Sequence, residues 1–335
     1  MAAEMAEQPR VLEALLARRE EVADQVRALA PAAPAGVVLL ARGSSDNAAH
    51  YGRYILEQHL GRPVSMAAPS ILTRYRADMD YSGYLVVALS QSGTTPEIVT
   101  AARAAGERGA RTLAVTNDAA SPLAAACDAF LPTGAGVERA VPATKTVTAQ
   151  MVALAIVAHA LGRPGAASAD LTGLVAGVEA VLGDDGPAAR VAQVLGEVDH
   201  LVVAGRGPAM AAAMEGALKV RETTGLVSDG VSVADLLHGP IRAVGDRTAV
   251  CTVDVGGPVG PDAADLAARV APLAAFTLGC SPRADDDLPL PAGLSEAAGA
   301  VAATVRLQQV ALALARCLGL DPDAPAGLSK VTLTH

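Results

Sequence analysis

The sequence predicts an α/β fold of two tandem domains, each a mainly parallel sheet flanked by helices in a doubly wound α-β-α sandwich. Two observations carry this prediction. Short continuous apolar runs alternate with helical segments, as in parallel sheets covered on both faces. A strand, an Arg-Gly pair and a helix occur over residues 36–61 and again over 200–225. The length of 335 residues suits two domains.

The first half contains the elements of one such domain in order. Residues 10–30 have apolar residues at helical spacing and predict an amphipathic helix. Later segments alternate between the two types. Strands are expected at 36–41, 84–89 and 112–118, and helices at 48–61, 96–110 and 148–162.

The expected domain boundaries follow from a stretch of small residues with Pro and Gly, "GRPGAASAD" (162–170), which indicates a linker. The predicted parts are an N-terminal helical segment (1–34), a first domain (35–162), a linker with helices (163–190), a second domain (191–320) and a C-terminal tail (321–335).

Composition argues against several classes of protein. The net charge of −9 and an aromatic content of 2% without Trp disfavour nucleic-acid binding. No apolar run reaches the roughly 18 residues of a membrane helix, and the N-terminus lacks the pattern of a signal peptide. Scattered cysteines without C-x-x-C spacing predict reduced, buried thiols. We therefore expect a cytoplasmic protein, with no metal and no other cofactor.

Hydroxyl residues gather where two predicted strands end and helices begin. The first cluster is "GSSD" (43–46), and the second is "SQSGTT" (90–95). Helix N-termini present unpaired N–H groups and a partial positive charge, so added hydroxyls predict a site for a phosphate monoester. The alternative is ordinary helix capping, although one cap does not need four hydroxyls. Neither cluster completes a nucleotide-binding motif.

The strand–"SQSG"–helix pattern resembles the sugar isomerase (SIS) domain family. Over nearly the whole chain, the sequence is most similar to the isomerase half of glucosamine-6-phosphate synthase and to SIS-type glucosamine-6-phosphate deaminases. Both contain two SIS units. The resemblance implies that the phosphate binds Ser45, Ser90, Gln91, Ser92 and Thr95, with Gly43 and Ser44 lining the substrate.

A further segment, "VERAVPATK" (137–145), resembles the substrate-lining loop of these enzymes. The resemblance implies a main-chain contact from Val141. The synthase has Ser where this chain has Ala143, whereas the deaminases have Ala there. This departure favours a deaminase.

Two carboxylates lie seven residues apart in "MEGALKVRE", at Glu215 and Glu222. Seven residues are about two helical turns, so both should face the same side of a helix. The resemblance implies that Glu222 is the base that moves a proton between C1 and C2 of a sugar. The alternative is that both are surface residues paired with Lys219.

Two further residues have implied roles. His238 in "LLHGP" matches the histidine that opens the sugar ring from the neighbouring subunit, although a lone histidine is more often structural. Lys330 in the tail matches a lysine that can form a Schiff base with the open-chain ketose. The alternative is a solvated lysine on a frayed terminus. Leu328, Val331 and Leu333 favour a docked tail.

The synthase draws ammonia from glutamine with an N-terminal domain whose nucleophile is the Cys after the initiator Met. This chain has Ala2 there, so we expect it to release ammonia and not to take it from glutamine. The expected reaction converts glucosamine 6-phosphate and water into fructose 6-phosphate and ammonia. The resemblance further implies a homodimer with His238 shared across the interface. The alternatives are an enzyme for a galactosamine phosphate or a phosphorylated fructosamine, a synthase-like subunit that receives ammonia from a partner, and a sugar-phosphate sensor.

Overall fold

A computed structural model describes residues 1–163 and 169–330, which form two compact units. The N-terminal unit comprises Arg10–Glu138 and Lys145–Ala169. The C-terminal unit comprises Met1–Pro9, Arg139–Thr144 and Asp170–Lys330. Residues 164–168 of the expected linker and 331–335 of the expected tail, which include Val331 and Leu333, lie outside the described residues.

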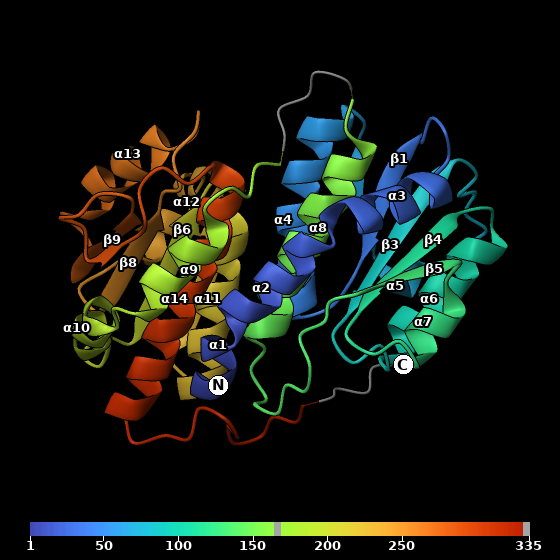
Figure 1. Cartoon of the computed structure of the whole chain (residues 1–335). Coiled ribbons are helices and arrows are strands. Elements are labelled where there is room, and N and C mark those ends of the chain that lie inside the picture. Colours follow the sequence, from blue (N-terminus) through green and yellow to red (C-terminus); the bar gives the residue numbers. More distant parts are fainter. Residues whose placement is uncertain (164–168, 331–335) are drawn as a thin grey trace. The chain divides into compact units, whose positions relative to one another are not determined.

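The N-terminal unit contains one parallel sheet with the strand order β2-β1-β3-β4-β5 (Figure 1). Its strands are β1 (Gly36–Leu40), β2 (Val64–Met66), β3 (Tyr84–Ser90), β4 (Arg111–Thr116) and β5 (Ala129–Pro132). The three predicted strands are β1, β3 and β4. The two strands at the sheet edges have only three and four residues, too few for a clear apolar run.

Helices cover both faces of this sheet. The helices of this unit are α2 (Gln8–Ala17), whose first two residues belong to the C-terminal unit, α3 (Arg19–Leu29), α4 (Ser44–Leu60), α5 (Pro69–Thr73), α6 (Pro96–Glu107), α7 (Pro122–Ala126) and α8 (Lys145–Leu161). On one face α8 packs against α3 and α4, and on the other α6 packs against α5 and α7. The predicted helix over 10–30 was wrong as a single element, because the chain breaks at Arg18 between α2 and α3.

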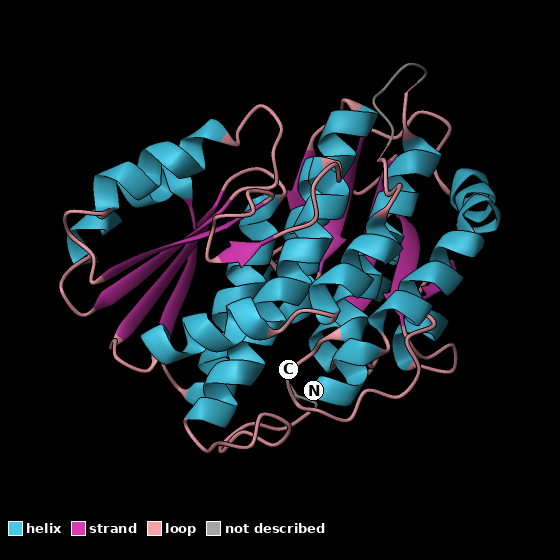
Figure 2. Cartoon of the chain, turned by 60° about the vertical axis from the view of Figure 1, so that its left-hand side comes forward, coloured by secondary structure: helices cyan, strands magenta, loops and turns pink. Residues whose placement is uncertain are grey.

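The C-terminal unit repeats the topology of the first sheet. Its strand order is β10-β9-β8-β6-β7, all parallel, so that β6 takes the place of β1 and β8 the place of β3. Figure 2 shows the strands in magenta and the helices beside them in cyan. The strands are β6 (His200–Gly205), β7 (Val227–Ser232), β8 (Thr248–Val253), β9 (Phe276–Ser281) and β10 (Leu288–Pro289). The predicted α/β fold with two tandem sheets is confirmed.

The helices of this unit are α1 (Ala2–Ala6), α9 (Leu174–Leu182), α10 (Gly186–Leu195), α11 (Ala209–Thr224), α12 (Val233–Leu237), the 3-10 turn η1 (Pro240–Ala243), α13 (Pro261–Val270) and α14 (Glu296–Cys317). Gly216 lets α11 approach α14 closely, since a Cβ there would lie 2.6 Å from Leu307 Cδ1. By length and apolarity α14 could cross a membrane, but 89% of its most apolar window is buried, as in the core helix of a soluble protein.

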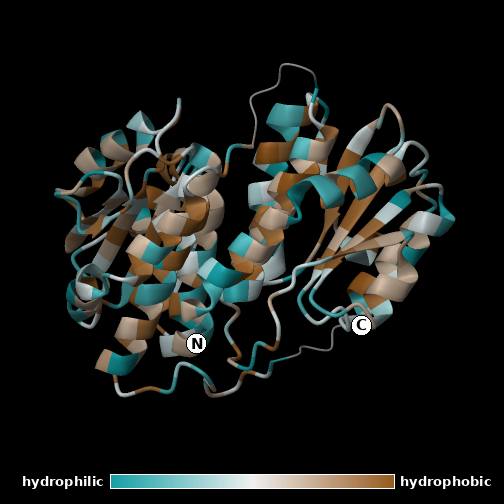
Figure 3. Cartoon of the chain, viewed as in Figure 1, coloured by the Kyte–Doolittle hydropathy of each residue, from teal (hydrophilic) through white to brown (hydrophobic). Residues whose placement is uncertain are grey.

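Apolar residues fill the strands and the helix faces that pack on them (Figure 3). The four cysteines are free thiols. The prediction that they are buried holds for Cys251 and Cys280 but is wrong for Cys317, which is exposed, and for Cys127, which is half-buried.

Candidate functional site

The two hydroxyl clusters of the N-terminal unit follow neighbouring strands. One comes after β1 and the other after β3, and these strands pair directly, with Leu40 opposite Ala88. The two clusters therefore lie at adjacent strand ends of one sheet. The strand order reverses here, because β2 lies on one side of β1 and β3 on the other. Open α/β sheets bind ligands at such a switch point, outside the carboxyl ends of the strands. We call residues 43–46, which include the first turn of α4, and residues 90–95, which begin with the last residue of β3, the two loops of the hydroxyl cradle.

Hydroxyl groups of the second loop are linked to one another. Ser90 Oγ accepts a hydrogen bond from the Gly93 N–H at 3.1 Å and lies 3.5 Å from Thr95 Oγ1. Ser92 Oγ lies 2.8 Å from Thr94 Oγ1. Within the described residues, Thr95 is the N-cap of α6 but its side chain makes no capping hydrogen bond. Simple capping thus does not explain this cluster.

Both loops depend on a glycine in the left-handed region. Gly43 has φ of +60° and Gly93 has φ of +63°, conformations that other residues rarely adopt. A Cβ on Gly93 would also lie 2.3 Å from Ser121 Oγ. Two residues after Gly43, the Ser45 side chain is buried at the start of α4. Burial raises the pKa of Asp46 at the same helix end, while His50 and Arg42 act to lower it.

The C-terminal unit places three charged side chains in a row along α11. Lys219 Nζ lies 3.3 Å from Glu215 Oε1 and also contacts Glu222 Oε2. Burial acts to lower the pKa of Lys219, but the two carboxylates raise it above its ordinary value. Because both carboxylates reach the same ammonium, they share one side of the helix, as predicted.

The alternative that Glu215 and Glu222 are both surface residues paired with Lys219 is wrong for Glu215 and Lys219, which are buried. The side chains of Lys219 and Glu215 are 0% and 2% exposed, whereas that of Glu222 is 24% exposed. Of the two carboxylates, Glu222 is therefore the one that a substrate can reach. The ammonium of Lys219 beneath it contacts both carboxylates and fixes the position of Glu222.

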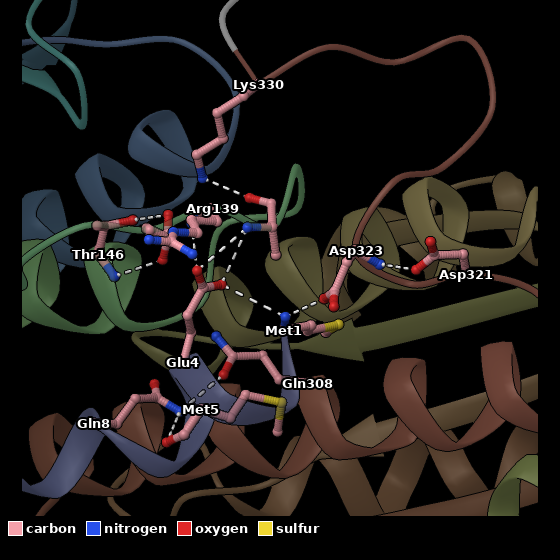
Figure 4. Close-up of polar contacts among 12 residues, drawn as sticks. Met1, Glu4, Met5, Gln8, Arg139, Thr146, Gln308, Asp321, Asp323 and Lys330 are labelled. Carbon is pink, nitrogen blue, oxygen red and sulfur yellow. Dashed lines mark hydrogen bonds and ion pairs between the residues drawn. The ribbon is translucent and has the colours of Figure 1, made fainter.

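The expected substrate-lining segment is held through its main chain in the C-terminal unit (Figure 4). The Glu4 carboxylate accepts the N–H groups of Arg139 and Ala140, the second at 3.3 Å. Lys330 Nζ donates to the Ala140 carbonyl at 2.7 Å. The N–H of Val141 donates to the Asp323 carbonyl at 2.9 Å.

The tail was expected to dock through its apolar residues, and the structure shows polar contacts in their place. Leu328 is 47% exposed, so apolar burial of that residue does not dock the tail. Polar contacts of Asp323 and Lys330 with Val141 and Ala140 dock it instead. Ala143 lies in the same segment and is half-buried.

His238 caps α12 and is exposed, followed by Gly239 with φ of +128°. Among the described residues, no hydrogen bond or ion pair joins the His238 ring to Glu222 or Lys330. Its role across a dimer interface stays a prediction. The described residues also contain no cluster of His, Cys, Asp or Glu that could hold a metal ion.

Nothing in the sequence indicated that Glu4 holds the main chain of the expected substrate-lining segment. It lies in a short helix, and no local pattern links it to residues 139 and 140, which are more than 130 positions away. The importance of Lys219 was visible only as a charge at helical spacing from two carboxylates, a pattern that surface helices share.

Comparison with known proteins agrees with this architecture. Residues 34–160 match the SIS domain family. The chain is 30% identical over 362 aligned residues to the glutamine–fructose-6-phosphate aminotransferase (isomerizing) of Symbiobacterium thermophilum, covering 98% of this chain and 58% of the relative. It is 33% identical to the Streptomyces coelicolor aminotransferase of the same name, covering 88% and 51%. The chain thus spans little more than half the length of these relatives.

Solved structures match over nearly their whole length. A presumed phosphosugar isomerase from Silicibacter pomeroyi is 32% identical, with a TM-score of 0.86 over 96% of this chain and 99% of that one. The glucosamine-6-phosphate deaminase of Thermotoga maritima shares the fold, with a TM-score of 0.80 at 22% identity over 99% and 98% of the two chains. The chain therefore belongs to the SIS domain family and contains two SIS-like units in tandem.

Proposed function

We propose that the chain is a phosphosugar aldose–ketose isomerase that acts as a deaminase on glucosamine 6-phosphate. The observation that carries the proposal is the row of Glu215, Lys219 and Glu222, in which one partly exposed carboxylate is fixed by a buried ammonium. The hydroxyl cradle supplies the complementary function, since it suits a phosphate monoester.

One base is sufficient for the proposed rearrangement. After ring opening, Glu222 takes the proton from C2 of the aldose and returns it to C1, which gives the 2-imine of fructose 6-phosphate. Water adds to C2 of the imine, and ammonia leaves. Lys330 suits the handling of the open-chain sugar, because an amine can form a Schiff base with a ketose.

Two observations favour an amino sugar as the substrate. The aminotransferase relatives carry fructose 6-phosphate in their names and align with 98% and 88% of this chain. At position 143 this chain has Ala, as the resemblance gives for the deaminases, whereas the synthases have Ser. A galactosamine phosphate, a phosphorylated fructosamine and a synthase-like reaction that uses free ammonia are alternative reactions of the same proton-transfer chemistry.

An ammonia assay with purified protein tests the proposal. We expect ammonia and fructose 6-phosphate to form from glucosamine 6-phosphate faster than from galactosamine 6-phosphate or a phosphorylated fructosamine. Product only in the reverse direction, from fructose 6-phosphate and free ammonium, would assign a synthase-like activity. Tight binding of the sugar phosphate without turnover would indicate a sugar-phosphate sensor. The presence of Glu222, His238 and Lys330 argues against a sensor, because binding alone does not need these residues.

The cradle gives a prediction for substrate affinity. In the double variant Ser90→Ala, Ser92→Ala, KM should rise at least about tenfold and far more than kcat falls, because each lost hydrogen bond to a charged group costs ~1.5–3 kcal/mol. Ser295→Ala is a matched control. The Ser295 hydroxyl accepts the Ala298 N–H and caps α14, so its loss should lower stability without changing KM. An unchanged KM in the double variant would refute the phosphate assignment.

The implied sharing of His238 gives a prediction for mixed dimers. Glu222→Gln and His238→Ala should each be inactive alone. When they are unfolded and refolded together in equal amounts, about half of the dimers should be mixed, and one of the two sites in each mixed dimer is intact. About a quarter of all sites should therefore recover activity. No gain over the separately refolded variants, in a sample shown by mass to contain mixed dimers, would place His238 within the site of its own chain or outside catalysis.

A further inference from the structure

An ion pair joins the two loops of the hydroxyl cradle. Arg42 follows β1 directly before Gly43, and Glu97 is the second residue of α6. Arg42 Nε donates to Glu97 Oε2 at 3.1 Å. The Glu97 side chain is 8% exposed, and a carboxylate so deeply buried requires a partner. The contact therefore spans the switch point of the sheet, between the ends of two neighbouring strands.

The C-terminal unit contains the same pair at the equivalent place. Arg206 follows β6 directly before Gly207 and pairs with Asp262, the second residue of α13. Since β6 and β8 take the places of β1 and β3, the two pairs are related by the internal repeat. Pro precedes the acidic residue in both copies, at positions 96 and 261.

The hydroxyl groups do not recur with the ion pair. The loop that corresponds to "SQSGTT" is "DVGGPVG" (254–260), and the residues after Arg206-Gly207 are Pro208-Ala209. Neither contains Ser or Thr. The ion pair therefore occurs with and without the groups that suit a phosphate. This separates its role from direct contact with an anion and ties it to the geometry of the two loops.

We propose that Arg42 and Glu97 are positioning residues that fix the distance between the two loops of the cradle, so that the hydroxyls of both reach one phosphate. The inference rests on the proposed function. It assigns neither side chain a contact with the substrate. The pair acts through Ser45 in the first loop and through Ser90 and Thr95 in the second.

Removing Glu97 distinguishes this role from a direct phosphate contact by Arg42. Glu97→Ala deletes a negative charge close to the anion and releases the guanidinium. By charge alone, both changes should tighten binding of a phosphate. A positioning role predicts the opposite result: about tenfold weaker binding of glucosamine 6-phosphate, equivalent to the loss of one hydrogen bond to the phosphate. KM should rise while kcat changes much less.

Two variants serve as controls. Glu97→Gln keeps an oxygen acceptor for Arg42 Nε and should restore most of the affinity. Asp262→Ala makes the corresponding deletion in the unit without the hydroxyls and should leave KM and binding unchanged, while its effect on thermal stability shows what loss of such a pair costs the fold.

Binding measured by titration calorimetry, with glucosamine 6-phosphate and separately with inorganic phosphate as probes, decides the outcome. If the wild-type chain binds neither probe, the proposed function fails. If the wild type binds but Glu97→Ala binds equally well or more tightly, the positioning role is overturned and the proposed function stands. If Glu97→Ala does not fold, Arg42→Lys takes its place. Lysine keeps the charge but loses the planar donor, so unchanged affinity in that variant would likewise overturn the inference.

Discussion

Glu222→Gln is expected to lower kcat by about 10²–10⁴, the usual contribution of a general base, with little change in KM. Glutamine keeps the size of the side chain and its place beside Lys219, but it cannot accept a proton at neutral pH. In deuterated water, the wild-type enzyme should incorporate solvent deuterium at C1 or C2 of the substrate and product. The variant should not, and mass spectrometry or NMR of the recovered sugars measures the difference.

Glu215→Gln is the matched control, because Glu215 shares the helix, the lysine and the carboxylate chemistry with Glu222. Its side chain is 2% exposed, so a substrate does not reach it without rearrangement of α11. We expect deuterium exchange to continue in this variant, with a loss of stability. If exchange instead continues in Glu222→Gln and stops in Glu215→Gln, the base has been assigned to the wrong carboxylate.

Much of the fold could be predicted because parallel strands buried on both faces have continuous apolar sequences. This holds for β1, β3 and β4, and the repeated Arg-Gly pair indicated the second sheet. The break at Arg18 could not be predicted, since no Gly or Pro marks it and the apolar spacing runs on through it. Short edge strands such as β2 were missed because three residues show no periodicity.

The candidate site divides in the same way. Each hydroxyl loop is local, and its main features lie within a stretch of fewer than ten residues. The contacts of Glu4 with Arg139 and Ala140 are not local, because they join residues that only the fold brings together. The burial of Lys219 likewise depends on the packing of α11 against other elements of the unit, which are α14, β6 and β7. Local spacing therefore could not distinguish a solvated charge pair from a buried one.

Lys219→Met is expected to destabilise the protein by about 3–5 kcal/mol, the usual cost of breaking a buried ion pair by removing one partner. Methionine fills a similar volume but leaves two carboxylates side by side, one of them buried, without the ammonium between them. The measurement is the free energy of unfolding in urea. Lys219→Met combined with Glu215→Gln should recover a large part of the loss, because the deeper carboxylate is then neutral.

The pH dependence of this variant gives a second test. In the wild type, the raised pKa of Lys219 keeps the ammonium charged near neutral pH, and its stabilisation is lost only as the pH rises above ~10.4, the ordinary lysine value. Without Lys219, burial should raise the pKa of Glu215 above its unfolded value, so the folded state then binds the extra proton. The variant should therefore be closest to the wild type near pH 5 and fall further behind as the pH rises to 8. A stability difference that is small and equal at both pH values would show that Lys219 does not compensate these carboxylates, and the fixed position assigned to Glu222 would lose its support.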